Sequence, residues 1–197
     1  MTNRVLVSMI VGLVAVLVVS GGIRLATAQD EETDTAPYCA TEAEAELLRR
    51  INDLREERGL DPLQLSQPLG RAAELKARDM AQDNYLAHIS PEGQGPEELL
   101  DQVGYTYNTA IGENIAAGQR SAEGTFEQWL NSPEHREIML GEQFTAVGIG
   151  RAHNPEAKYD WYWAAEFGGK VGEPADVCES ATPQQGAGER VRPFTRA

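Results

Sequence analysis

The spacing of hydrophobic residues changes along this 197-residue chain, from a helical period to a strand period. Helical spacing runs from a capping-box pattern at residues 41–44 to Gly59, and begins again at Pro68. Strand-like runs follow at residues 146–152 and 159–167, with a turn-forming Asn-Pro-Glu between them. Helices first and an antiparallel hairpin last predict an α+β layered domain.

Three shorter helices and one further strand are predicted between these segments. Pro96 favours a helix start and Gly104 its end, while Ser132 and Pro133 are typical of the cap and the first residue of another helix. About 170 residues remain after an export signal, which is the usual size of one domain. The expected elements are helices at 41–59, from 68, at 96–104, around 126–130 and at 132–141, and strands at 111–116, 146–152 and 159–167.

The first 28 residues have the pattern of a signal peptide. Arg4 gives a positive start, residues 5–19 form an apolar run, and residues 26–28 (Ala-Thr-Ala) match a small-x-small cleavage site. The run is shorter than the roughly 20 residues that span a bilayer, so cleavage and secretion are expected. The alternative is an uncleaved membrane anchor over residues 5–28. In both cases the folded part lies outside the cytoplasm, and we expect a monomer.

The composition of the rest of the chain indicates an acidic protein with one domain between two flanking segments. Residues 1–28 hold Arg4 and Arg24 and no acid, so their removal changes the formal net charge from −14 to −16. Nucleic acid and anionic lipid surfaces are therefore poor partners. Residues 29–40 and 179–197 hold too few apolar side chains to offset their ordering entropy, and are expected to be a flexible acidic leader and a flexible tail. The predicted domain spans residues 41–178.

Two cysteines, Cys39 and Cys178, stand at opposite ends of this domain. Because an exported chain meets an oxidising compartment, we expect them to form one disulfide bond. In the chain-entropy model a loop of this length stabilises the fold by roughly 4 to 5 kcal/mol.

Three residues are candidates for a functional site: His88 after the second helix, His135 in the first turn of the last helix, and Glu113 in a Gly-Glu-Asn sequence between them. Imidazole nitrogens and a carboxylate are a common ligand set for Zn²⁺, and three protein ligands keep a fourth position open. Spacing alone does not show that they converge, because a His in a first helical turn is often a cap or a surface residue.

Other chemistry has weak support in the sequence. A Gly-x-Ser-x-Gly elbow, a phosphate-binding loop and a His-Glu-x-x-His helix are all absent. Trp129, Trp161 and Trp163 fit either the walls of an apolar ligand groove or anchors of the core.

Four motifs in order resemble the bacterial branch of the CAP superfamily, the cysteine-rich secretory, antigen 5 and pathogenesis-related proteins, also called SCP domains. The resemblance covers residues 41–169. The motifs are NYLAH at 84–88, GENIA at 112–116, WLNSPEHR at 129–136 and FTAVGIG at 144–150.

The resemblance implies a three-layer α-β-α sandwich with a central antiparallel sheet, and a cleft holding two His and two Glu that binds a divalent metal. His88, Glu113 and His135 match three of these residues. The expected fourth position is Ser132, so a nearby carboxylate such as Glu127 is a candidate substitute. With one acidic ligand fewer, Zn²⁺ binding is expected to be weak or optional.

Three functions remain open at this point. We expect a non-enzymatic extracellular module that binds a small lipid, a sterol or a partner protein, as relatives in the superfamily do. The alternative is a metal-dependent hydrolase or peptidase that uses His88, His135 and Glu113, with Glu113 as ligand or general base. In the third hypothesis these residues form only a buried polar network.

Overall fold

The computed structural model describes residues 37–179, so the predicted signal peptide and most of both predicted flanks lie outside it. The predicted helices and strands all form, within a few residues of their expected bounds. The helices are α1 (Glu42–Glu57), α2 (Gln67–Gln82), α3 (Pro96–Gln102), α4 (Ala122–Asn131) and α5 (Pro133–Met139); the strands are β1 (Cys39–Ala40), β2 (Gln64–Leu65), β3 (Ile111–Ala117), β4 (Ala146–Asn154), β5 (Asp160–Gly168) and β6 (Asp176–Val177).

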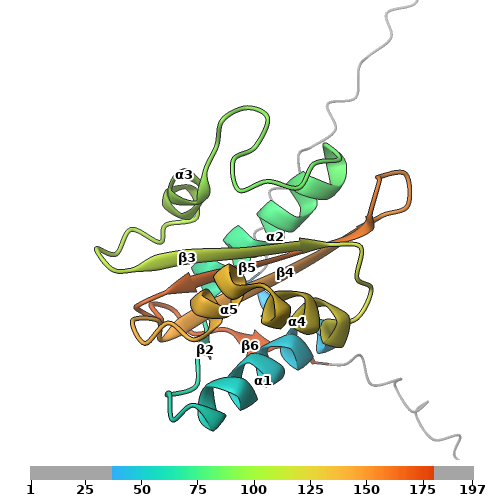
Figure 1. The fold of residues 1–197 in the computed structure, drawn as a ribbon. Helices are drawn as coiled ribbons and strands as arrows, with labels where there is room; N and C mark the ends of the chain where they lie inside the picture. The colour runs from blue at the N-terminus through green and yellow to red at the C-terminus, as the bar shows by residue number, and fades with distance from the viewer. Residues whose placement is uncertain (1–36, 180–197) are drawn as a thin grey trace, which may run out of the picture. The chain divides into compact units, whose positions relative to one another are not determined.

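The main sheet has the strand order β2-β4-β5-β3, which puts β3 at one edge. Strands β3, β5 and β4 pair antiparallel, whereas the two residues of β2 pair parallel to β4. Helices α2 and α3 lie on one side of this sheet, and α1, α4 and α5 lie on the other (Figure 1). The α+β sandwich with helical outer layers is therefore confirmed, and the parallel β2 is an addition to the antiparallel sheet that we expected.

Helix α2 lies so close to strand β4 that there is no room for a side chain at the two strand positions facing it, Gly148 and Gly150. A Cβ atom built on Gly148 would lie 2.0 Å from backbone atoms of Leu69 and Gly70, and one on Gly150 would lie 2.3 Å from the backbone of Ala73. Small residues on the helix complete the fit, because Ala73 and Ala77 are fully buried against the sheet. The two glycines thus allow helix and strand backbones to touch.

The opposite face of the sheet carries the larger core. Trp129 and Trp163 are fully buried there, which makes them core anchors rather than groove walls. Trp161 is only partly buried, and its ring contacts the His153 ring at 4.2 Å between centroids and the Arg151 guanidinium at 3.8 Å.

A second small sheet joins the two ends of the domain. Strand β1 pairs with β6, and the predicted disulfide between Cys39 and Cys178 is confirmed. The adjacent Tyr38 is 2% exposed, and its hydroxyl donates to the Ile149 carbonyl at 2.8 Å. The prediction that residues 29–40 are flexible is therefore wrong for residues 38–40, because Tyr38 supplies the apolar surface that the rest of the leader lacks.

Arg55 is a buried cation in α1 that joins segments far apart in the sequence. Only 1% of the residue is exposed, and its guanidinium donates to the carbonyl oxygens of Asp61, Met139, Gly141 and Phe144 at 2.9 to 3.1 Å. These bonds tie the end of α5 and the entrance to β4 to the first helix. Burial lowers the pKa of Arg55, but an arginine stays charged at any physiological pH.

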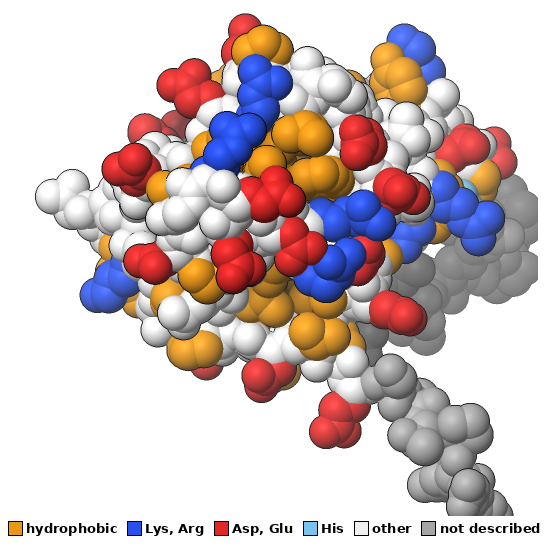
Figure 2. Space-filling model, turned by 60° about the horizontal axis from the view of Figure 1, so that its bottom comes forward, with side chains coloured by type: hydrophobic (Ala, Val, Ile, Leu, Met, Phe, Trp, Pro, Cys, Tyr) orange, Lys and Arg blue, Asp and Glu red, His pale blue; other side chains and the backbone are white. Residues whose placement is uncertain are grey.

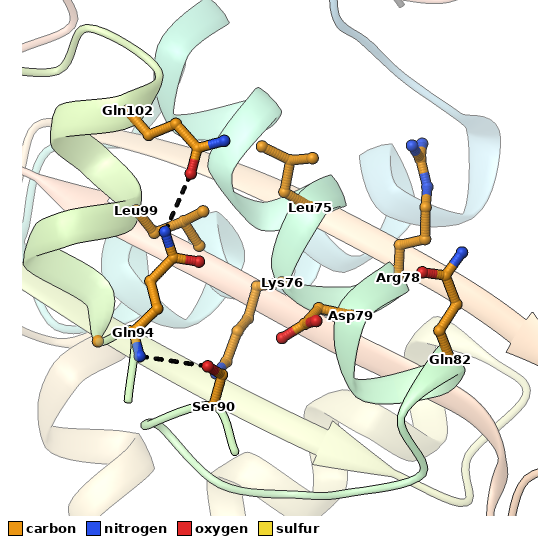
Figure 3. Close-up of a pocket in the computed structure, with 10 residues that line it drawn as sticks. Leu75, Lys76, Arg78, Asp79, Gln82, Ser90, Gln94, Leu99 and Gln102 are labelled. Carbon is orange, nitrogen blue, oxygen red and sulfur yellow. Dashed lines mark hydrogen bonds between the residues drawn. The ribbon is translucent and has the colours of Figure 1, made fainter. Parts of the chain in front are cut away.

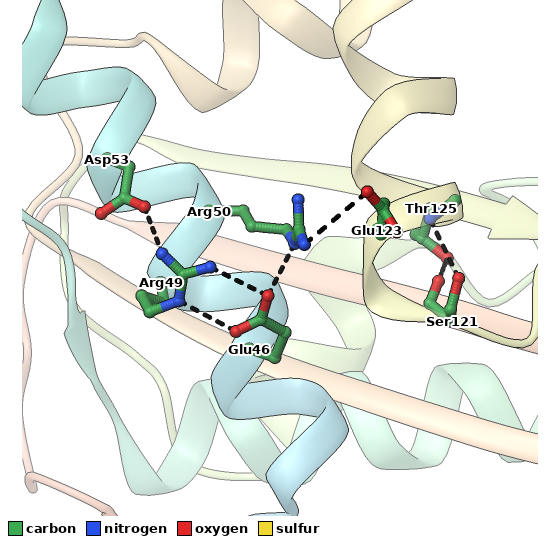
Figure 4. Close-up of polar contacts among 8 residues, drawn as sticks. Glu46, Arg49, Arg50, Asp53, Ser121, Glu123 and Thr125 are labelled. Carbon is green, nitrogen blue, oxygen red and sulfur yellow. Dashed lines mark hydrogen bonds and ion pairs between the residues drawn. The ribbon is translucent and has the colours of Figure 1, made fainter.

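Figure 2 shows charged side chains of both signs on one face of the molecule. On the face in Figure 2, acidic side chains are spread among basic and apolar ones. Close to the α1 and α4 contact, Glu46 pairs with Arg49 and Arg50, while Arg50 also reaches Glu123 at 3.9 Å (Figure 4). Such exposed pairs contribute little to stability. Within residues 37–179, no helix is long and apolar enough to cross a membrane.

Replacing Arg55 with alanine should destabilise the protein by at least about 3 kcal/mol, because several buried carbonyl groups would lose their donors. Arg49→Ala on the exposed face of the same helix is the matched control, and should leave the unfolding midpoint nearly unchanged. Urea unfolding followed by circular dichroism measures both. Equal midpoints for the two variants would contradict a central role for Arg55.

Candidate functional site

The candidate site lies at the edge of the sheet, where β3 brings Glu113 opposite Glu166 of β5. Residues directly opposite one another in paired strands project from the same face. Two residues further along, Ile115 and Ala164 pack against α2, so this is the α2 face of the sheet. The two glutamates are therefore held side by side beneath α2.

His88 reaches Glu113 from the loop that follows α2. The imidazole Nδ1 lies 2.5 Å from Glu113 Oε1, in a hydrogen bond between a side chain that is 54% exposed and one that is 3% exposed. This hydrogen bond and the negative charge of Glu113 raise the pKa of His88, against the opposing effects of desolvation and of the nearby Lys76. The pair joins a solvent-facing base to a buried carboxylate.

Glu166 is completely buried beside this pair. Burial, then the charge of Glu113 and a hydrogen bond with it, raise the pKa of Glu166 well above its ordinary range. Among residues 37–179, neither oxygen of Glu166 nor Oε2 of Glu113 has a conventional donor. A protonated Glu166 would supply the missing donor, so we expect the two carboxyl groups to share one proton.

Lys76 of α2 binds the loop that carries His88. It is 4% exposed, and its ammonium donates to the His88 carbonyl at 2.9 Å and to the Tyr85 hydroxyl at 3.2 Å. Its positive charge lowers the pKa values of His88 and Glu166 and so partly offsets the influence of Glu113 on both. The network therefore runs from Lys76 of α2 through the His88 loop to the paired glutamates.

His135 approaches β3 from the opposite face. Asn114, the neighbour of Glu113 in β3, donates through its side-chain amide to the His135 carbonyl at 3.0 Å. The ring Nδ1 of His135 is buried and has no partner in the part of the chain that the structure describes. Burial and then the positive charge of His88 lower the pKa of His135. His135 is thus within electrostatic reach of His88, although β3 separates their helical layers.

The donor atoms match Zn²⁺ in kind but do not form a ready site. In residues 37–179, no three His, Cys, Asp or Glu side chains are grouped so that they could hold a metal ion. Glu113 is bonded to Nδ1 of His88, which leaves Nε2 as that ring's free nitrogen, and His135 lies on the other face of β3. The geometry therefore does not fit a preformed metal centre.

An open cleft of about 410 Å³ lies next to Glu113. Its walls come from the loop after His88, from the start of α3 and from the start of β3, and include Ile89, Pro96 and Ile111. The two other sequence candidates lie elsewhere: Glu127 is exposed on α4, and Ser132 caps α5 through its backbone. Neither is among the residues that line this cleft.

Sequence reasoning overlooked Glu166 and Lys76, although both left a signal. Glu166 is the only charged residue in the run 161–168, and a charge inside a buried strand commonly marks a functional or polar cluster. Lys76 occupies a position in the small apolar stripe of α2, between Ala73 and Met80.

The family model of the cysteine-rich secretory protein family, abbreviated CAP, matches residues 48–167. The chain therefore belongs to this family, and the resemblance seen in its motifs is confirmed. The match contains Glu113, Glu166 and both histidines of the site.

Individual relatives agree with this assignment. The chain is 36% identical over 146 residues to the uncharacterized protein YkwD of Bacillus subtilis, a match that covers 74% of this chain and 54% of that one. It thus spans about half the length of this relative. An extracellular protein with an SCP domain from Bacillus anthracis is 29% identical, with a TM-score of 0.57 over 64% of this chain and 40% of that one. An outer surface protein of Borrelia burgdorferi shares the fold at 20% identity, with a TM-score of 0.58 over 68% of this chain and 98% of its own.

Glu166→Gln should change how stability depends on pH. Because the folded-state pKa of Glu166 lies above its ordinary value of 4.5, the wild-type protein loses stability as pH rises from that value through the folded-state pKa. Glutamine keeps a donor toward Glu113 and does not titrate, so the variant should gain stability relative to wild type as pH rises above 4.5. Thermal unfolding in the presence of a chelator measures this difference. The exposed Glu97→Gln is the control, and a pH-independent difference for Glu166→Gln would contradict the assignment.

Proposed function

We propose that this chain is an exported, non-enzymatic binding module that holds its ligand in the cleft beside Glu113. The observation that carries the proposal is Glu113, which lines an open cleft of about 410 Å³ and is hydrogen-bonded to His88. Small-molecule sites commonly combine apolar walls with a few such polar groups. The export pattern of residues 1–28 and the similarity to an extracellular protein support a place outside the cytoplasm.

The walls of the cleft favour a small apolar ligand such as a lipid or a sterol. Ile89 is 56% exposed at the cleft, although a large aliphatic side chain gains free energy from burial. Pro96 and Ile111 add to this apolar surface, while Glu97 and Glu98 are further polar residues of the same cleft. A ligand with one polar group would cover Ile89 and direct that group to Glu113. An extracellular protein partner that covers Ile89 is the alternative occupant.

Metal binding is proposed as a weak and optional property of the same site. Zn²⁺ would bind Nε2 of His88, because Nδ1 is bonded to Glu113, and it would have to draw His135 toward His88 at a cost in free energy. A zinc ion bound there would supply positive charge to the cleft. The metal-dependent hydrolase stays a prediction, and unchanged hydrolysis by a His88→Ala and His135→Ala variant would contradict it.

The lipid proposal predicts that palmitate or cholesterol binds the purified protein and that Ile89→Ser weakens binding about tenfold, since roughly 1.5 kcal/mol of apolar contact is lost. Val177→Ser is a matched control, because Val177 is 50% exposed on β6, outside the cleft. Native mass spectrometry measures both variants. Failure of both lipids to bind, or equal binding by the two variants, would contradict the lipid proposal.

Zinc titrated into chelator-treated protein should bind more weakly than in structural zinc sites, whose apparent binding free energies are about 10 to 16 kcal/mol. Affinity should fall further between pH 7.5 and 5, because imidazoles bind metal only when neutral and Glu113 raises the pKa of His88. Calorimetry on wild type and the double histidine variant measures this. Equal affinity in that variant would place the metal elsewhere.

A further inference from the structure

A pocket of about 180 Å³ lies on the far side of the His88 loop, between α2, the loop and α3. Figure 3 shows Lys76 and Asp79 projecting from α2 toward the loop that carries Ser90 and Gln94, with Leu75 and Leu99 beside them. At about 30 Å³ for each water, this volume holds roughly six water molecules. It therefore suits a compact ligand the size of alanine or valine.

The charged side chains that line the pocket all come from α2: Lys76, Arg78 and Asp79. In Figure 3, Arg78 extends away from Lys76 and Asp79, which project toward the loop. Lys76 and Asp79 are three residues apart in α2, so their side chains are neighbours. Lys76 uses two of its three donors on the Tyr85 hydroxyl and the His88 carbonyl, and the same hydroxyl donates to Asp79 Oδ2. Tyr85 thus holds the ammonium and the carboxylate in a fixed relation.

A second feature is the apolar and amide surface around these charges. Leu75 and Leu99 give the pocket an aliphatic side. At the α3 side, the Gln94 side-chain amide donates to Oε1 of Gln102 at 3.0 Å, and the Gln94 backbone N–H donates to Ser90 Oγ at 3.2 Å. These bonds link the loop to α3 through uncharged groups.

We propose that this pocket binds a free α-amino acid with a small aliphatic side chain. Its carboxylate would accept from Lys76, its ammonium would donate to Asp79, and its side chain would lie against Leu75 and Leu99. A simple anion would meet repulsion from Asp79, and a simple cation would meet repulsion from Lys76, whereas a zwitterion satisfies both groups. The proposal goes beyond the cleft function, because the ligand, the pocket and the binding residues differ; only the Lys76 bond to the His88 carbonyl joins the two sites.

The test is calorimetry with L-valine, L-valinamide and N-acetyl-L-valine on the intact protein, with amide chemical shifts of α2 and the loop to locate the ligand. We expect valine to bind and each analogue to bind at least about tenfold more weakly, because each lacks one charged hydrogen bond. Equal binding of valine and either analogue would overturn the proposal. So would the absence of any valine binding at millimolar concentration.

A matched pair of variants completes the test without disturbing the buried Lys76. Asp79→Asn should weaken valine at least about tenfold, since the bond to the ligand ammonium loses its charge. N-acetyl-L-valine lacks that ammonium, so its affinity should not fall in the same variant. Asp101→Asn removes an exposed acid of α3 that does not line the pocket, and should leave valine binding unchanged. Equal valine affinity in the two variants would contradict the assignment of Asp79.

Discussion

The contact between helix α2 and strand β4 determines how close Lys76 and the His88 loop lie to the paired glutamates. Gly148 and Gly150 let the helix backbone touch the strand, and the small residues of α2 extend that contact. Any larger side chain at these two glycines would lift the helix from the sheet. Because α2 packs so closely on the sheet, the Lys76 ammonium can donate to the His88 carbonyl and also interact electrostatically with Glu166. The site thus depends on a packing constraint that involves none of its own side chains.

This arrangement explains why the histidines and glutamates form a polar network more readily than a metal centre. Glu113 is shared between His88 above it and Glu166 beside it, and His135 is held beyond the edge strand by Asn114. The motifs shared with the CAP family indicated that His88, Glu113 and His135 belong to one site. The pairing of β3 with β5 brings in the second carboxylate, Glu166, whereas Glu127 of α4 had been proposed from the sequence.

Most of the fold could be predicted from local patterns, since capping residues, prolines and the change of hydrophobic period mark the ends of the elements. The capping box at Thr41 and the first-turn prolines of three helices all have their expected roles. Long-range pairings of short segments could not be predicted, because two-residue strands such as β1 and β6 have no period to detect. The same limit hid Glu166, whose partner lies 53 positions earlier in the chain and meets it only through sheet register.

The central claim is that Glu166 stays protonated at neutral pH and donates to Glu113, so that the buried site carries one negative charge instead of two. Carboxyl ¹³C chemical shifts in glutamate-labelled protein, assigned with Glu166→Gln, measure this directly in the presence of a chelator. The account predicts that the Glu166 carboxyl keeps the shift of a protonated acid at pH 7. A Glu166 shift typical of an ionised carboxylate at pH 7, with its titration at an ordinary pKa, would contradict it.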